Sequence, residues 1–252
     1  QPRDVAIQQT KAGFIFVFDL DTGESVFPVE ERPIPQSDVP GEVTFPTQPF
    51  PVLPEPFTLT TLTRDDMYGL TPLDRLWCQN RFDELRYEGM FTPPSIEGTL
   101  HFPGFAGGGN WGGASFDPNS NLLIIKSLTM ATVHHLIPNP SGEITLLPAP
   151  DAQAVPGAGG QDGLGDPMPG TPYRTVNENF LSPLGVPCTP PPWGTLTAVD
   201  MDSGTVQWQI PFGKVRRYGI TFPGFLEWGT SIIGGPISTA GGLVFMAASM
   251  DK

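Results

Sequence analysis

Basic residues, cysteines and long apolar segments are all scarce in this sequence. Lysine and arginine together number 13 against 26 aspartates and glutamates, which gives a formal net charge of −13. An acidic surface repels phosphate groups, so nucleic acid and anionic membranes are poor partners, and a neutral or cationic partner fits better. No stretch approaches the roughly 18 consecutive apolar residues that a membrane span requires, and the first residues show no signal-peptide pattern.

The two cysteines and the histidines form no recognisable metal-binding pattern. Cys78 and Cys188 lack the spacing of a zinc site, and the sequence does not decide whether they pair. Two structural thiols are the favoured interpretation, with a disulfide as the alternative that an oxidising compartment would support. The adjacent His134 and His135 would point to opposite faces of a strand, so ordinary packing or surface positions are expected for them.

Short motifs of several enzyme classes are missing as well. The sequence contains no Gly-x-Ser-x-Gly, no His-Glu-x-x-His and no dinucleotide fingerprint. The glycine run at residues 107–109 lacks the lysine and the following helix of a phosphate-binding loop. Nicotinamide and ATP chemistry are therefore not expected.

Glycine and proline, in contrast, are abundant, with 30 and 31 residues among 252. This composition disfavours long helices and suits many short strands joined by turns and loops. A hydrophobic fraction of 38%, with 17 Phe and 5 Trp, supplies enough apolar surface for a core, which argues against disorder. We therefore expect an all-β chain, long enough for one large domain or two smaller ones.

Two hairpin patterns share the same spacing. Residues 194–208 read as a strand, a turn at Asp202 to Gly204 and a returning strand that ends at Trp208, and residues 17–27 repeat the Asp, the Gly and the closing aromatic, here Phe27. We expect an Asp to cap each turn, the Gly to adopt a positive φ, and Trp208 to fill a seam that locks neighbouring blades together.

A second repeated unit consists of a glycine-rich loop, a strand, a polar turn and another strand. It occurs at residues 104–125 and again at 234–246, and further strands are predicted at 14–18 and 98–102. Repeats of this kind are typical of a β-propeller of four-stranded blades, because one blade cannot bury its faces alone. A β-sandwich is the alternative fold, but it does not explain the repeated spacing.

Two long segments interrupt the repeats. Residues 28–94 form a loop and helix excursion that opens with prolines every few positions, so its first half must be extended and cannot join a sheet interior. Residues 148–192 are expected to form a loop-rich insertion.

One short helix is predicted within the first of these segments, from Pro72 to about Arg86. Thr71 is its expected N-cap and Asp74 the third residue of a capping box. The apolar residues Leu73, Leu76 and Trp77 should share one face. The charged residues are assigned to a solvated face, namely Asp74, Arg75, Arg81, Asp83, Glu84 and Arg86.

Three residues could take part in binding or catalysis. Lys11 lies at a turn that feeds a buried strand; a solvated turn lysine is the simplest interpretation, but at the end of an inner strand its ammonium could polarise a carbonyl or stabilise an oxyanion. Asn110 could hydrogen-bond a polar ring edge while Trp111 packs against the ring, with flanking glycines that admit a planar ligand closely. The alternative for this pair is a blade turn with a buried tryptophan, which the spacing alone favours.

The hairpins resemble the tryptophan-docking motif of the pyrroloquinoline quinone (PQQ) dehydrogenases. Further segments resemble the membrane-bound glucose dehydrogenase branch of that family, which includes quinate/shikimate dehydrogenases; they are residues 10–14, 30–33, 40–42, 46–50, 86–89, 91–94, 108–113 and 191–196. The resemblance covers essentially the whole chain, and it is more specific for the family than for a substrate.

The resemblance implies an eight-bladed propeller, of which residues 1–252 would supply about half as one partial domain. It implies oxidation of a sugar or polyol alcohol group in the periplasm by a membrane-associated enzyme, with PQQ as cofactor and ubiquinone as electron acceptor. In the family's mechanism an Asp takes the hydroxyl proton, hydride goes to the quinone carbonyl carbon, and a bound Ca or Mg ion polarises that carbonyl.

The same resemblance assigns roles to the three candidate residues. Lys11 matches the cationic residue that contacts the quinone oxygens, and Asn110, with Trp111 beside it, matches an asparagine on the other side of PQQ. The catalytic Asp, the metal ligands and the remaining blades are expected outside this chain, so the isolated chain should be inactive. The alternative function is a non-catalytic β-propeller that binds protein or carbohydrate through its loops.

Overall fold

Short antiparallel sheets make up most of the computed structural model, which describes residues 3–139, 165–214, 216–217, 220–221, 227–230 and 233–247. The central sheet has the strand order β12-β11-β7-β6. Its strands are β6 (Ala114–Asp117), β7 (Leu122–Leu128), β11 (Gly194–Asp200) and β12 (Val206–Pro211). The predicted all-β fold is confirmed, and this sheet has the four strands expected of one blade.

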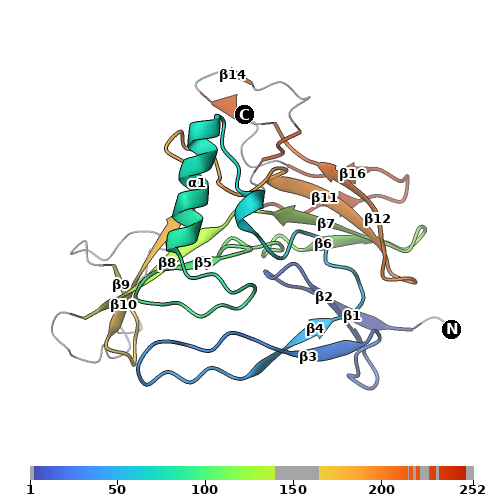
Figure 1. The fold of residues 1–252 in the computed structure, drawn as a ribbon. Coiled ribbons are helices and arrows are strands. Elements are labelled where there is room, and N and C mark those ends of the chain that lie inside the picture. Colours follow the sequence, from blue (N-terminus) through green and yellow to red (C-terminus); the bar gives the residue numbers. More distant parts are fainter. Residues whose placement is uncertain are drawn as a thin grey trace, which may run out of the picture.

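The two faces of the central sheet pack against different strand pairs. On one face β1 (Val5–Gln9) and β2 (Ile15–Asp19) share a core with β7 and β11 through Ile15, Val17, Phe57, Leu123, Ile125 and Val199. On the other face β15 (Ile237–Ser238) and β16 (Val244–Phe245) follow, with Val244 and Met246 packed on Ile124, Leu196 and Ala198. Figure 1 shows this succession from β1–β2 through the central sheet to β16. Each sheet thus buries its faces against its neighbours, as stacked blades do.

The chain leaves the central sheet after β7 and returns to it at β11. The segment between them contributes three strands, β8 (Thr132–Pro138), β9 (Asp166–Pro167) and β10 (Tyr173–Asn179), to a second sheet of order β5-β8-β10-β9, in which β5 is Thr99–His101. Residues 148–164 of the predicted loop-rich insertion lie outside the described residues, and its described part contains β9 and β10. A small pair, β13 (Arg216–Arg217) and β14 (Ile220–Thr221), completes the described strands.

The proline-rich start of residues 28–94 forms a separate two-stranded sheet. Strand β3 (Val29–Pro33) pairs antiparallel with β4 (Thr47–Pro51), and all five residues of β3 are exposed. Because both strands are edges, the prolines remove no hydrogen bond from a sheet interior. The prediction that this segment is extended and stays out of a sheet interior is confirmed.

Both predicted hairpin turns form with the expected chemistry. The Asp19 carboxylate accepts from the backbone N–H of Asp21 at 3.0 Å and of Thr22 at 3.1 Å. The Asp200 carboxylate accepts from those of Asp202 and Ser203, both at 2.9 Å. These backbone N–H groups lower the pKa of both carboxyls. Gly23 and Gly204 each have φ of +74°, as the turns require.

The role of Trp208 in locking neighbouring blades stays a prediction, since further blades are expected outside residues 1–252. Its side chain is 36% exposed, on the edge strand β12, on which every residue but Val206 is exposed. Its counterpart Phe27 does pack, against the core shared by β2 and β7. A Cβ at Gly204 would lie 3.3 Å from the Phe27 ring, so this ring contacts the turn of the other hairpin.

The helix starts where it was predicted to start. It is α1 (Pro72–Glu84), with Thr71 as N-cap accepting from the Asp74 backbone N–H at 3.2 Å and with Pro72 in the first turn. It follows a short 3₁₀ helix, η1 (Arg64–Asp66). It ends two residues before the predicted end, since Leu85 is the C-cap. Local capping chemistry therefore located the helix within the usual boundary error.

The solvated face predicted for α1 is confirmed for Arg75, Asp83 and Glu84, but not for Asp74. Leu73 is 79% exposed and Leu76 and Trp77 are exposed too, whereas the buried residues are Asp74 and Cys78. Asp74 lies one turn before Cys78. Its carboxylate accepts from the backbone N–H of Leu70 at 3.0 Å and so binds the segment that precedes the helix. The shared face of Leu73, Leu76 and Trp77 is not the buried one, because the disulfide of Cys78 holds the opposite side of the helix against the core.

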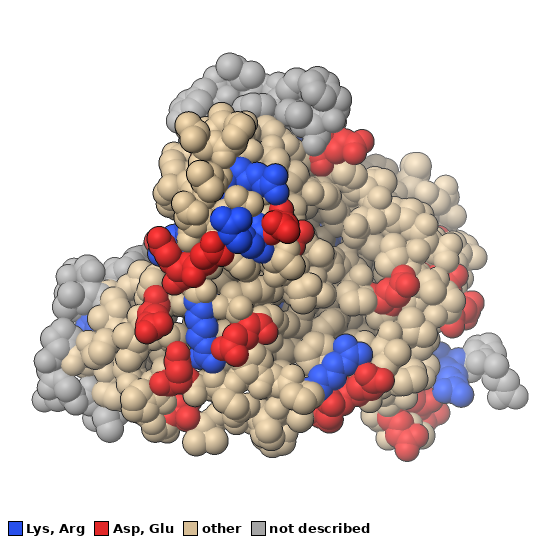
Figure 2. All heavy atoms as spheres, in the orientation of Figure 1, with Lys and Arg blue, Asp and Glu red and all other residues tan. Residues whose placement is uncertain are grey.

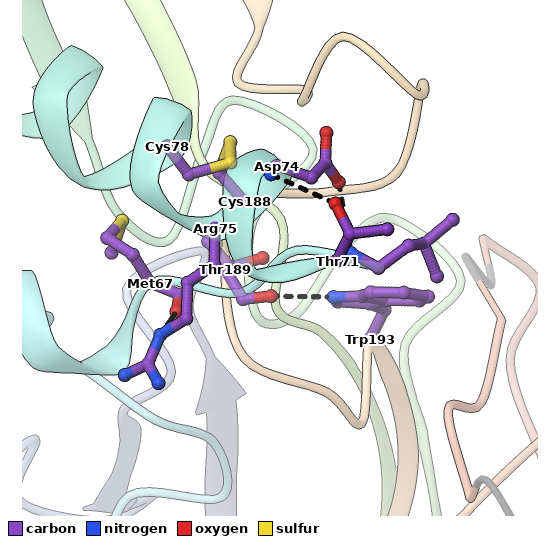
Figure 3. The surroundings of a disulfide bond; sticks show 9 residues. Met67, Thr71, Asp74, Arg75, Cys78, Cys188, Thr189 and Trp193 are labelled. Carbon is purple, nitrogen blue, oxygen red and sulfur yellow. Dashed lines mark hydrogen bonds between the residues drawn. A yellow bond between two sulfur atoms is a disulfide. The ribbon is translucent and has the colours of Figure 1, made fainter.

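That disulfide joins Cys78 to Cys188, so the interpretation as two separate thiols is wrong. The two residues are 110 positions apart in sequence, their Cα atoms are 5.5 Å apart, and both are fully buried. Figure 3 shows the bond between α1 and the segment that leads to Trp193, whose indole N–H donates to the Thr189 carbonyl at 2.9 Å. The bond ties the helix to the segment that enters β11.

Arg86 is also misassigned to a solvated helix face. It lies beyond α1, its side chain is 17% exposed, and it pairs with Glu88 at 2.7 Å and Asp38 at 3.3 Å. Its Nη2 also donates to the Gln36 carbonyl at 2.6 Å. Arg86 thereby holds the loop between β3 and β4 against the rest of the chain.

The three histidines lie in the second sheet. The rings of His101 and His134 have centroids 4.0 Å apart, while His135 lies 3.9 Å from the Glu178 carboxylate. Adjacent positions on β8 thus have different partners, in line with the packing role expected for them. Burial and the neighbouring His101 and His135 lower the pKa of His134 from 6.5 to about 4.

Acidification is expected to destabilise the fold through His134. The unfolded histidine titrates near 6.5 and the folded one near 4, so the unfolded state binds more protons between these values and stability falls as the pH drops through that window. The full pKa shift of His134 corresponds to a loss of at most about 3 kcal/mol in the free energy of unfolding. Because the ring is partly exposed, the expected loss between pH 7 and 5 is about 1–2 kcal/mol. Urea unfolding at several pH values measures it; an unchanged pH slope in His134→Gln would contradict the assignment.

Candidate functional site

Lys11 lies in the tight turn that joins β1 to β2. The turn closes through the Thr10 backbone N–H, which donates to the Phe14 carbonyl at 2.9 Å, and Gly13 has φ of +86°. The following strand is buried at Ile15 and Val17. The exposed ammonium of Lys11 donates to the Phe105 carbonyl at 2.6 Å. The predicted turn and buried strand are confirmed, and the lysine is held by a loop that follows β5.

That loop, residues 104–113, packs directly on the Lys11 turn. The backbone N–H of Gly108 donates to the Lys11 carbonyl at 2.7 Å, and that of Gly109 to the Thr10 carbonyl at 3.1 Å. A Cβ at Gly107 would lie 2.6 Å from the Lys11 Cβ, and one at Gly109 would lie 2.9 Å from the Thr10 carbonyl oxygen. The glycines were expected to leave room for a planar ligand. In the structure, their missing side chains leave room for the close approach of the Lys11 turn.

Asn110 and Trp111 follow these glycines. The Asn110 amide is used within its own loop: its NH₂ group donates to the Ala106 carbonyl at 2.9 Å, and its oxygen accepts from the Trp111 backbone N–H at 2.8 Å. One N–H and one lone pair of the amide are left for another partner. The Trp111 side chain is 83% exposed, so the alternative of a buried tryptophan is wrong.

One cavity brings the three candidate residues together. It has a volume of about 1660 Å³, and Lys11, Asn110 and Trp111 all line it. Its walls come mainly from β1 and from β6 with the loop before it. The wall therefore offers an ammonium, an amide and an open indole ring, a combination suited to a planar ligand with polar edges.

Two residues of this region were missed by the sequence interpretation. Gln9, the last residue of β1, lines the cavity, and its side-chain NH₂ donates to the Asn110 carbonyl at 2.9 Å. Its position two residues before Lys11 at a strand end was the available signal. Lys126 was missed because the predicted strand stopped at Ile125, whereas β7 continues to Leu128.

Lys126 is fully buried in the central sheet, where it pairs in register with Leu196. Burial, and secondly the charge of Lys11, lower the pKa of Lys126 to about 8. The positive charge of Lys11 thus disfavours a second positive charge at Lys126.

Among the residues that the structure describes, no group of three or more His, Cys, Asp and Glu side chains could hold a metal ion. Acidic and basic side chains are interspersed on the face in Figure 2, without a continuous basic patch there. Within the described part of the chain, no helix has the length and apolar character to cross a membrane.

Comparison with known proteins places the chain in a family. The chain is 39% identical to a quinate/shikimate dehydrogenase (quinone) of Acinetobacter baylyi over 96% of the chain and 30% of that protein. It is 40% identical to the quinoprotein glucose dehydrogenase of Escherichia coli over 96% of the chain and 30% of that protein. It is 40% identical to the glycerol dehydrogenase large subunit of Gluconobacter oxydans over 100% of the chain and 35% of that protein.

The chain thus spans about a third of the length of these curated relatives. The family model "PQQ: Glucose/ethanol/alcohol dehydrogenase, beta-propeller domain" matches residues 1–252. The match confirms the propeller-type fold and the resemblance from which the site residues were inferred. The chain belongs to the β-propeller family of PQQ-dependent glucose, ethanol and alcohol dehydrogenases.

Proposed function

We propose that the full-length protein is a PQQ-dependent dehydrogenase that oxidises an alcohol group of a sugar or polyol and passes the electrons to ubiquinone. The observation that carries this proposal is that Lys11, Asn110 and Trp111 line one cavity. The relatives named above support it, since their names are those of a quinate/shikimate dehydrogenase (quinone), a quinoprotein glucose dehydrogenase and a glycerol dehydrogenase.

The residues of the cavity fit such a cofactor. A volume of about 1660 Å³ is ample for a fused three-ring quinone. The open ring of Trp111 offers an aromatic face, and the Asn110 amide has one N–H and one lone pair left for a polar ring edge.

Bound PQQ would supply the quinone carbonyl that accepts hydride from the substrate carbon. Lys11 would hold its ammonium against the oxygen where negative charge develops, after exchanging the Phe105 carbonyl for the ligand. Asn110 would use its remaining N–H on a polar edge of the ring system. The loop 104–113 would keep both groups in place, because it is bonded to the Lys11 turn through its backbone.

Three further parts of the proposal lie beyond this chain. The general base and a divalent Ca or Mg ion would be held by residues outside residues 1–252, as would the blades that close the propeller. The enzyme would act on the periplasmic side of the membrane, where ubiquinone is accessible to a membrane-associated protein.

Titration with PQQ tests the proposed function. Adding PQQ to the full-length protein in the presence of calcium should quench tryptophan fluorescence in a saturable way, because Trp111 is exposed in the cavity. Trp111→Phe should lose a measurable part of the quenching. Absence of saturable quenching in the wild type would support a non-catalytic propeller instead.

A further inference from the structure

The two sides of the proposed cofactor site come from different sheets. Lys11 belongs to the turn of the β1–β2 sheet, whereas Asn110 and Trp111 precede β6 of the central sheet. Chemistry on a bound quinone depends on the spacing of these groups to within a fraction of an ångström, so some contact must hold one side against the other.

Two backbone bonds, from Gly108 and Gly109 to the Lys11 turn, contribute to this, and Gln9 adds a side-chain contact at Asn110 itself. Its Nε2 donates to the Asn110 carbonyl at 2.9 Å across 101 residues of sequence. The Asn110 carbonyl also accepts from the Gly113 backbone N–H at 3.0 Å, but that bond lies within the loop itself. In the described part of the chain, Gln9 makes the only recorded side-chain hydrogen bond from the β1–β2 sheet to Asn110.

The orientation of the Gln9 amide is determined by its surroundings. A flipped amide would place its oxygen against the Asn110 carbonyl, which is also an acceptor. The actual orientation leaves Oε1 buried without a partner among the described residues, and a Cβ at Gly109 would lie 3.0 Å from it. The amide is thus packed against the loop in the one orientation that donates to Asn110.

We propose that Gln9 is a positioning residue of the cofactor site, which fixes Asn110 and Trp111 relative to Lys11 by donating to the Asn110 carbonyl. This inference rests on the proposed function, and it concerns the same cavity. Gln9 acts through Asn110 and Trp111, so its loss should weaken cofactor binding without removing any charged group from the site.

Two variants of Gln9 in the full-length protein test the inference by PQQ affinity. Gln9→Met removes the donor and keeps the length of the side chain, and Gln9→Glu keeps a side-chain oxygen but loses the N–H. Both should weaken PQQ binding by about three- to tenfold, the usual effect of one hydrogen bond. Gln207→Met is the matched control, because the exposed Gln207 amide donates to the Thr205 hydroxyl at 3.4 Å and does not line the cavity.

A double-mutant cycle separates positioning from a general effect on stability. The double variant Gln9→Met/Asn110→Ala should lose clearly less PQQ affinity than the product of the two single-variant losses. The reason is that Gln9 acts through Asn110, so its effect is smaller once the Asn110 side chain is gone. Multiplicative losses, or full affinity in Gln9→Glu, would overturn the inference. Failure of the wild type to bind PQQ would instead reject the proposed function.

Discussion

Replacing both cysteines, as in Cys78→Ala/Cys188→Ala, is expected to lower the free energy of unfolding by about 4 kcal/mol. The disulfide closes a loop of 110 residues in sequence, and the loss of closure entropy in the unfolded chain grows with loop length. The oxidised wild type should have the higher urea midpoint and the smaller slope, because its cross-linked unfolded chain exposes less surface.

Reductant provides the control for this result. Adding dithiothreitol during unfolding should bring the wild type to the stability of the double variant and leave the variant unchanged. Because both sulfurs are fully buried, reduction of the native protein should be slow until the fold opens. A difference below about 1 kcal/mol between oxidised and reduced protein would contradict a stabilising role.

The second large effect is expected at Lys11. In the full-length enzyme, Lys11→Ala should reduce kcat by about 10²–10³-fold, the usual loss when one group that stabilises a developing oxyanion is removed. Lys11→Arg should retain part of the activity, because it keeps the charge with a different shape. Steady-state kinetics with a dye acceptor measures both variants.

Lys214 is a suitable control for the Lys11 variants. It is an exposed lysine that does not line the cavity, so Lys214→Ala should keep full activity. If Lys11→Ala also kept full activity, the assignment of Lys11 to the site would be wrong, even for an enzyme that binds PQQ.

Features with local causes were predictable from the sequence. The turns at Asp19 and Asp200 form because an aspartate and a glycine at fixed spacing satisfy backbone N–H groups and permit a positive φ. The start of α1 follows from Thr71 and Pro72 in the same way. Such signals need only a few neighbouring residues.

Features that depend on distant parts of the chain were not predictable in this way. The buried face of α1 contains Cys78, whose disulfide partner Cys188 is 110 residues away. In the site, the resemblance proposed Lys11, Asn110 and Trp111, but the contact of Gln9 with Asn110 depends on two sheets meeting. Pairings between sheets leave no regular spacing in the sequence.

The disulfide and its core also unite the two segments that interrupt the repeats. One buried cluster contains Leu62, Met67, Cys78 and Leu85 from the first segment and Phe180 and Cys188 from the second, together with residues of β5 and β8. The chain between β7 and β11, which contains the second segment, leaves and re-enters the central sheet at adjacent points, since the Thr129 backbone N–H donates to the Trp193 carbonyl at 3.1 Å. The deletion of either segment alone would therefore leave the other with an open apolar face and an unpaired thiol.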